Sequence, residues 1–317
     1  MPQTEYRHPS EADIEAVNDV LNRSEREIPL HRDETVSETS QYTFEEDDYD
    51  PKGFLLAVVG DEVVGYGGSH VNDHRIKAGK NDAWITVEVA PEHRGKDIER
   101  HLMGFGLEYL RSRKVATAHR WCVGTEGWRH ELSKDFGFHD NRHFFTLVWT
   151  GDEGPALLAL PAGFGFAEAI FREASDEEVI AFATAMNQAF ADHYNFAPRP
   201  PESFLKWRET DENISRLSWV SDGDRVVGVC MCAESVPYNK ENDTKVGWAN
   251  VLGVVESHRK RGIGRALLSE GMKWLSDRGM DTIYLRLDAE NRGALDLYTN
   301  LGFKVHSESI GYVLELD

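Results

Sequence analysis

The sequence predicts an α/β fold made of two tandem domains. One reason is length, because 317 residues exceed one ordinary core and suit two domains of about 150 residues. The other is an internal repeat. HRGKDIERHLM (93–103) aligns with HRKRGIGRALL (258–268) at an offset of 165, and FGF (136–138) falls on LGF (301–303) at the same offset. Matches in the same order and register indicate a tandem duplication.

A third match helps to place the domain boundaries. GDEVVGYG (60–67) resembles GDRVVGVC (223–230) at an offset of 163, so the two copies keep almost the same register. We therefore predict an N-terminal domain at residues 1–150 and a C-terminal domain at residues 166–317. The stretch between them, residues 151–165, is rich in Gly, Pro and Ala and is expected to be the linker.

Each copy begins with a helix signal. Ser10 precedes EADIEAVNDVLN, and Ser175 stands three residues before Glu178, a capping-box spacing, ahead of VIAFATAMNQAF. Apolar and β-branched runs then predict two strands joined by a Gly-Asp or Asp-Gly turn, and a further strand before the repeated loop. A long amphipathic helix follows that loop. The expected strands are 54–59, 63–70 and 83–90 in the first copy, and 216–221, 225–234 and 248–255 in the second.

Composition indicates a soluble globular chain, with 40% hydrophobic and 28% charged residues. The longest apolar runs are too short to cross a bilayer, and the polar opening MPQTEYRHPSEAD lacks the features of a secretion signal. We expect a cytoplasmic protein without a membrane partner. Cys122, Cys230 and Cys232 make no disulfide framework. Cys230-Met-Cys232 lacks the spacing of a redox or zinc pair, so we expect no metal and predict two strand residues on one face.

The formal net charge of −20 argues against a nucleic-acid partner, because phosphate binding needs a basic footprint. The same charge is compatible with a cationic substrate such as an amine, and also with simple solubility.

The loop of the second copy has the features of an anion site. Residues 259–265 read RKRGIGR, follow a β-rich strand and open a helix. A helix N-terminus offers unpaired N–H groups and the positive end of the dipole, and glycines let backbone approach a pyrophosphate closely. The flanking arginines add charge. A glycine pair alone is weak evidence, because a tight strand–helix turn needs the same residues.

The surrounding residues carry a family resemblance. LGVxxxxRKRGIGRALL followed by ENxxALxLYxxLGF, within residues 247–305, resembles the GNAT N-acetyltransferase superfamily. The repeated unit is similar to tandem GNAT proteins of the mycothiol synthase-like kind. For each domain the resemblance implies a mixed α/β fold, with a mainly antiparallel mixed sheet flanked by helices and a splayed central strand pair. It also implies direct transfer of acetyl from acetyl-CoA, the co-substrate, to an amine within a ternary complex.

The resemblance also implies residue roles. The loop would hold the CoA pyrophosphate, and the strand segment before it would pair with the pantetheine arm and polarise the thioester carbonyl. Tyr298 would act as general acid toward the departing thiolate, since an ordinary phenol stays protonated at neutral pH. The implied cofactor-binding residues are Leu252, Gly253, Val254, Arg259, Lys260, Arg261, Gly262, Ile263, Gly264, Arg265 and Asn291.

The general base is open. Many members of the superfamily carry a glutamate on the strand before the loop, but here that strand reads GWANVL (247–252), without a carboxylate. A base from elsewhere, a water relayed by Asn250, or an acceptor that arrives neutral would each satisfy the chemistry. His193, in the loop after the first helix of the second copy, is a candidate because it titrates in the right range, although a surface or structural role suits it as well.

The first copy lacks the cofactor motif. Asp97 and Glu99 replace the loop glycines, and Glu126 and Ser133 stand where Asn291 and Tyr298 do in the second copy. Two carboxylates beside a pyrophosphate would together cost about 3–4 kcal/mol even with solvent screening, or at least about a hundredfold in affinity. We therefore expect a degenerate N-terminal domain with no productive acetyl-CoA site. We also expect the loop carboxylates to serve as its own counter-anion at the helix N-terminus.

The function predicted from the sequence is N-acetylation of a primary amine on a small molecule, with the C-terminal domain catalytic. A CoA-binding sensor or scaffold without turnover is the alternative from another class. A mycothiol synthase-like acetyltransferase is the narrower enzymatic one. The chain is expected to be a monomer that forms a pseudo-dimer by itself, or a homodimer.

Overall fold

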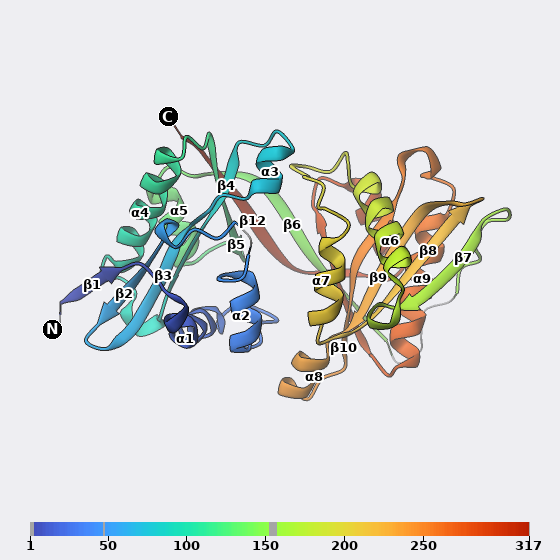
Figure 1. Cartoon of the computed structure of the whole chain (residues 1–317). Coiled ribbons are helices and arrows are strands. Elements are labelled where there is room, and N and C mark those ends of the chain that lie inside the picture. The colour runs from blue at the N-terminus through green and yellow to red at the C-terminus, as the bar shows by residue number, and fades with distance from the viewer. Residues whose placement is uncertain (1–2, 47, 152–156, 317) are drawn as a thin grey trace. The chain divides into compact units, whose positions relative to one another are not determined.

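The structure, a computed structural model, describes residues 3–46, 48–151 and 157–316. The chain forms two compact units (Figure 1). The first combines Met1–His143 with Glu308–Asp317, and the second is Phe144–Ser307. Among the described residues, no helix is long and apolar enough to cross a membrane.

The first unit contains one mixed sheet with helices on both sides of it. Its strand order is β1-β2-β3-β4-β5-β12, and every neighbouring pair is antiparallel except β4 with β5. The strands are β1 (Thr4–Arg7), β2 (Phe54–Val59), β3 (Glu62–His70), β4 (Asp82–Val89), β5 (Thr117–Val123) and β12 (Lys304–Glu315). The α-helices are α1 (Ile14–Glu25), α2 (Val36–Tyr42), α3 (Asp73–Lys77), α4 (Ile98–Ser112) and α5 (Trp128–Asp135).

The second unit repeats this architecture. Its strand order is β6-β11-β10-β9-β8-β7, with β10 and β11 the parallel pair. The strands are β6 (His139–Thr150), β7 (Gly165–Ile170), β8 (Ile214–Asp222), β9 (Arg225–Glu234), β10 (Val246–Val254) and β11 (Thr282–Asp288). The α-helices are α6 (Asp176–Ala189), α7 (Ser203–Thr210), α8 (Val236–Asn242), α9 (Ile263–Asp277) and α10 (Arg292–Asn300).

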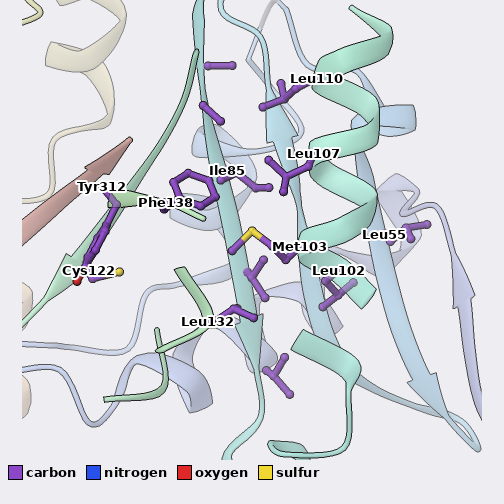
Figure 2. Close-up of a cluster of buried hydrophobic side chains, with 14 of the residues drawn as sticks. Leu55, Ile85, Leu102, Met103, Leu107, Leu110, Cys122, Leu132, Phe138 and Tyr312 are labelled. Atoms are coloured by element: carbon purple, nitrogen blue, oxygen red, sulfur yellow. The ribbon is translucent and has the colours of Figure 1, made fainter. Parts of the chain in front are cut away.

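The two sequence repeats exchange their last strands. Ser309–Glu315 of β12 pairs with β5 in the first unit, and Phe144–Thr150 of β6 pairs with β11 in the second. Tyr312 is only 1% exposed in the first core, beside Cys122 (Figure 2), and its hydroxyl lies 3.0 Å from His130 Nδ1. The boundaries at 1–150 and 166–317 were predicted from the sequence repeats, and each compact unit takes one strand from the other repeat.

Most local predictions are confirmed. All six predicted strands occur, and Ser175 accepts a hydrogen bond from the Glu178 N–H in a complete capping box. Gly60 and Gly223, at the two hairpin turns, have φ of 65° and 58°, the left-handed region that favours glycine. Of the predicted linker, residue 151 and residues 157–165 can be compared with the structure, whereas residues 152–156 lie outside the described residues.

The long helices α4 and α9 pack on the sheets through equivalent glycines. A Cβ on Gly106 would lie 2.6 Å from Ile85, and one on Gly271 would lie 2.4 Å from Cys232 Sγ. Cys230 and Cys232 are buried with their sulfur atoms 3.8 Å apart, so both face α9 from one side of the sheet, as predicted.

Candidate active site

The parallel strands of the second unit separate, as the family resemblance implies. β10 pairs with β11 only over Val246–Trp248, and beyond Trp248 it continues to Val254 with its ladder to β9 alone. The pairing with β9 also shifts register around Asn250. Along Leu252–Val254 the backbone edge toward β11 therefore has no strand partner, and such an edge can hydrogen-bond an extended ligand.

The loop after β10 is shaped as an anion site. Lys260 and Gly262 have φ of 61° and 88°, and α9 begins directly afterwards at Ile263. The first N–H groups of this helix, which is 15 residues long, are free of helical partners. Lys260, Arg261 and Arg265 are exposed, and none of them has a hydrogen bond or ion pair to the rest of the described chain. Three unpaired cations at a helix N-terminus suit a pyrophosphate.

Arg259, predicted to bind the cofactor, is tied to the protein by four hydrogen bonds. Its Nε donates to the Val254 carbonyl at 3.0 Å, and its terminal nitrogens bind the Asp192 carboxylate at 2.5 and 2.8 Å and the Ala189 carbonyl at 2.7 Å. The Asp192 carboxylate raises the pKa of Arg259. This guanidinium holds the loop against the end of α6, and its role as a phosphate ligand stays a prediction.

Tyr298 and Asn291 lie on and beside α10. The Asn291 carboxamide oxygen accepts from the Ala294 N–H at 3.1 Å and caps the helix, which leaves its NH₂ group for a ligand. Tyr298 is 8% exposed, with its ring edge-on to Phe303. Burial, with Cys230 nearby, raises the pKa of Tyr298, so the phenol keeps its proton at neutral pH. The sulfur of Cys230 faces α9, which places Tyr298 on the α9 side of the sheet.

A cavity of about 400 Å³ lies on the other side of the same sheet. Gly247 faces Leu275 of α9, so its neighbour Trp248 points to the opposite face, into this cavity. The cavity is where β10 and β11 begin to separate. Its lining residues are Asn213, Ala233, Ser235, Trp248, Ala249, Asn250 and Arg286.

The structure brings only one base candidate into this cavity. Asn250 lines it, at the irregularity in β10, whereas His193 does not. His193 packs edge-on against Phe190 with ring centroids 4.4 Å apart, and partial desolvation lowers its pKa. Arg286 was missed by sequence reasoning. The available signal was a lone arginine in the apolar strand YLRLD (284–288), two residues past the last β10 partner.

The equivalent loop in the first copy provides its own anion, as predicted for Glu99. The Glu99 carboxylate accepts the Gly95 N–H at 2.7 Å. Asp97 does something else: it has φ of 65° at the position of Gly262, and its side chain makes no cap hydrogen bond. Asp97 thus tolerates the left-handed turn without closing the site.

In the first copy, side chains at the start of α5 connect this helix to β4 and α1. Arg129, on α5, reaches Glu88 on β4 at 2.5 Å and Ser24 on α1, and its guanidinium stacks on Trp128 with a centroid distance of 4.6 Å. At the offset of 165, these positions correspond to small or short residues in the second copy. The equivalent residues are Gly293 for Trp128, Ala294 for Arg129, Gly253 for Glu88 and Ala189 for Ser24.

Comparison with known protein families gives two matches in one chain. The model of the acetyltransferase (GNAT) family matches residues 15–138 and again residues 180–303, which repeats the offset of 165. Mycothiol acetyltransferase from Tsukamurella paurometabola is 28% identical over 236 residues, covering 72% of this chain and 77% of that protein. Mycothiol acetyltransferase from Amycolatopsis mediterranei is 27% identical over 285 residues, covering 84% and 85%.

Solved structures agree on the fold. A tandem GNAT protein from the clavulanic acid biosynthesis pathway has a TM-score of 0.74 at 14% identity, covering 99% of this chain and 98% of that chain. A GCN5-related N-acetyltransferase from Sphaerobacter thermophilus has a TM-score of 0.69 at 22% identity, covering 98% and 95%. The resemblance carried by the loop and α10 motifs is confirmed: the chain belongs to the GNAT family as a tandem, mycothiol synthase-like member, and it is an acetyl-CoA-dependent N-acetyltransferase.

Proposed function

We propose that the second unit alone carries the reaction, transferring acetyl from acetyl-CoA to a primary amine of a small molecule by direct attack in a ternary complex. The observation that carries this proposal is the contrast between equivalent positions in the two copies. In the first copy, Trp128 and Arg129 bring large side chains between α5, β4 and α1, whereas the equivalent residues of the second copy, Gly293 and Ala294, are small. We propose that the first unit, with Glu99 in its loop, binds no acetyl-CoA productively.

The residues of the second unit fit acetyl-CoA. Lys260, Arg261, Arg265 and the N–H groups at the start of α9 would hold the pyrophosphate, and the free edge at Leu252–Val254 would pair with the pantetheine arm. The bound thioester supplies an activated acetyl group. The chain contributes backbone N–H groups that stabilise negative charge on the carbonyl oxygen.

Proton transfer would fall to groups on the two sides of the sheet. Tyr298 keeps its proton and can donate it to the leaving sulfur on the α9 side. On the cavity side, Asn250 can hold a water that accepts a proton from the amine. His193, neutral at pH 7 because its pKa is lowered, is the second candidate base and would act from the end of α6.

The experiment combines titration calorimetry of acetyl-CoA with thiol release across a panel of amines. We expect one acetyl-CoA per chain and release of CoA with at least one amine. Gly293→Trp with Ala294→Arg, which copies the first unit into the second, should abolish both, while Asp97→Gly in the first loop should change neither. Binding without release for any amine would support a sensor instead. Retained binding in the double variant would locate the site elsewhere.

A mycothiol synthase-like acetyltransferase is the narrower hypothesis for the acceptor. The two relatives named above are mycothiol acetyltransferases, and each aligns with more than two thirds of this chain. Including their acceptor in the amine panel tests it directly.

A further inference from the structure

Arg286 has an unpaired guanidinium at the point where the central strands separate. It lies on β11 two residues after Tyr284, the last β11 residue that pairs with β10. The residue is exposed and lines the cavity. Within the described part of the chain its side chain has no hydrogen bond and no carboxylate partner. The guanidinium carbon of Arg286 lies over the ring of Trp248, 5.3 Å from the ring centroid.

Two other arginines of the same unit show how this differs from the local pattern. Arg216 and Arg278 also lie over a tryptophan, Trp274, at 5.2 and 5.3 Å. Each of them has a carboxylate partner at 2.7 Å, Glu168 for Arg216 and Glu234 for Arg278. Arg216 and Arg278 therefore combine a stacked tryptophan with a carboxylate partner, whereas Arg286 has only the tryptophan.

The cavity itself offers no anion to Arg286. Its other lining residues are neutral, and they include three polar side chains, from Asn213, Ser235 and Asn250. Surrounding protein desolvates the guanidinium and lowers the pKa of Arg286. An unpaired guanidinium beside neutral hydrogen-bonding side chains suits a bound oxyanion, which the planar fork can bind in a bidentate manner. The chain as a whole carries a net charge of −20, so this cavity is locally opposite in sign to the molecule.

We propose that Arg286 binds an oxyanion group of the acceptor, a carboxylate or a phosphate, so that the substrates are small amines that also carry an anionic group. This inference rests on the proposed function and specifies its acceptor. The Arg286 fork binds the oxyanion in a bidentate manner, and the neighbouring amides and hydroxyl complete its hydrogen bonds. The amine then enters the opening between β10 and β11 from the face opposite α9, while the Tyr298 phenol lies on the α9 side.

The test compares matched acceptor pairs that differ only in the anion. We would measure CoA release with glucosamine 6-phosphate against glucosamine, and with β-alanine against β-alaninamide. For at least one pair, kcat/KM should be more than about tenfold higher for the anionic member, because the site holds a cation that the neutral analogue leaves unpaired. Arg286→Gln should remove that difference by lowering the anionic member alone. Arg286→Lys should keep part of the phosphate preference, since lysine holds charge without the fork.

A matched control and a binding readout separate the possible failures. Arg225→Gln, at the start of β9 and outside the cavity, should leave the preference unchanged. Calorimetry with N-acetyl-β-alanine and N-acetylglucosamine 6-phosphate needs no turnover. If neutral amines turn over as well as anionic ones, or if Arg286→Gln lowers both members alike, the inference fails and the proposed function stands. If nothing turns over but an anionic ligand binds only with Arg286 intact, the reaction fails and the anion site stands.

Discussion

Restoring the loop glycines of the first copy should weaken the protein without creating a second cofactor site. The perturbation is Asp97→Gly together with Glu99→Gly, which turns HRGKDIERHL into the anion-binding pattern HRGKGIGRHL. Charge repulsion from these two carboxylates was our expected reason for the lost site, and the double variant removes it. Trp128 and Arg129 remain in place, with Arg129 bound to Glu88 and stacked on Trp128. We therefore expect one acetyl-CoA per chain, as in the unmodified protein.

The stability change follows from what each side chain does. Glu99 accepts the Gly95 N–H at 2.7 Å, and a hydrogen bond to a charged group contributes about 1.5–3 kcal/mol. A glycine in its helical position costs about a further 1 kcal/mol. Asp97 has φ of 65°, so glycine relieves about 1–2 kcal/mol of left-handed strain but loses a similar amount of chain entropy. The double variant should lose about 2–4 kcal/mol, almost all of it from Glu99.

The assays are urea unfolding and calorimetric stoichiometry, on the single variants and the pair. Asp97→Gly alone should change the free energy of unfolding by less than about 1 kcal/mol, because its two effects oppose each other. The reciprocal variants Gly262→Asp and Gly264→Glu are the control, and the second of them should remove acetyl-CoA binding. Two acetyl-CoA molecules per chain would refute the role of Trp128 and Arg129 in excluding the cofactor from the first unit. An unchanged stability in Glu99→Gly would refute the role of Glu99 as a built-in anion.

Three further outcomes follow from single residues. Tyr298→Phe should keep the acetyl-CoA Kd within about twofold and lower kcat by about a hundredfold or more, because only proton donation is lost; an unchanged kcat would exclude Tyr298 as the acid. Glu88→Ala should destabilise the first unit by about 3–5 kcal/mol in urea unfolding, since it leaves the buried Arg129 guanidinium short of an anion, and turnover by the second unit should persist. Burial, with Glu88 and Glu34 nearby, raises the pKa of Glu25 to about 7. The folded protein therefore keeps a proton that the unfolded chain releases, and the free energy of unfolding should decrease as the pH rises from about 4.5 to about 7. Because the Glu25 side chain is 39% exposed, Glu25→Gln should raise the free energy of unfolding by only about 1 kcal/mol at pH 8 and by less at pH 5.

Features set by local sequence were predictable. The capping box at Ser175, the hairpin glycines and the strand–loop–helix order each depend on residues within a few positions of one another. The separation of β10 from β11 was also expected, although from family resemblance rather than from the strand residues themselves. These predictions needed no knowledge of which distant segments meet.

Features set by distant contacts were not predictable. Nothing in the apolar pattern of 139–150 or 304–315 shows that each strand pairs in the unit of the other repeat, because both alternatives bury the same residues. The Glu88–Arg129 pair joins residues 41 positions apart, and Arg286 gains meaning only from the cavity that Trp248 and Asn250 complete. The repeat alignment did contain one usable signal, the change from Glu88 to Gly253 in the strand before the loop.

The two copies act as an internal control that separates fold from function. Arg94 and Arg259 occupy equivalent positions and make equivalent hydrogen bonds. In each, Nε donates to the carbonyl five residues back, at Val89 or Val254. A terminal nitrogen donates to a carbonyl at the end of α1 or α6. The first copy keeps this arginine although its loop is filled by Glu99. An arginine at this position is therefore explained by loop geometry, and it carries no evidence for phosphate binding.

The positions that differ give the opposite result. The equivalent helices α5 and α10 both form, although Trp128 and Arg129 of the first copy are replaced by Gly293 and Ala294 in the second. The exchange therefore keeps the helix and removes the large side chains that connect it to β4 and α1. Residues shared by the copies thus define the scaffold, and residues that differ define the site. On this reasoning Arg286 belongs to the second group, because its counterpart in the first copy is Trp121, which cannot bind an oxyanion as a charged fork does.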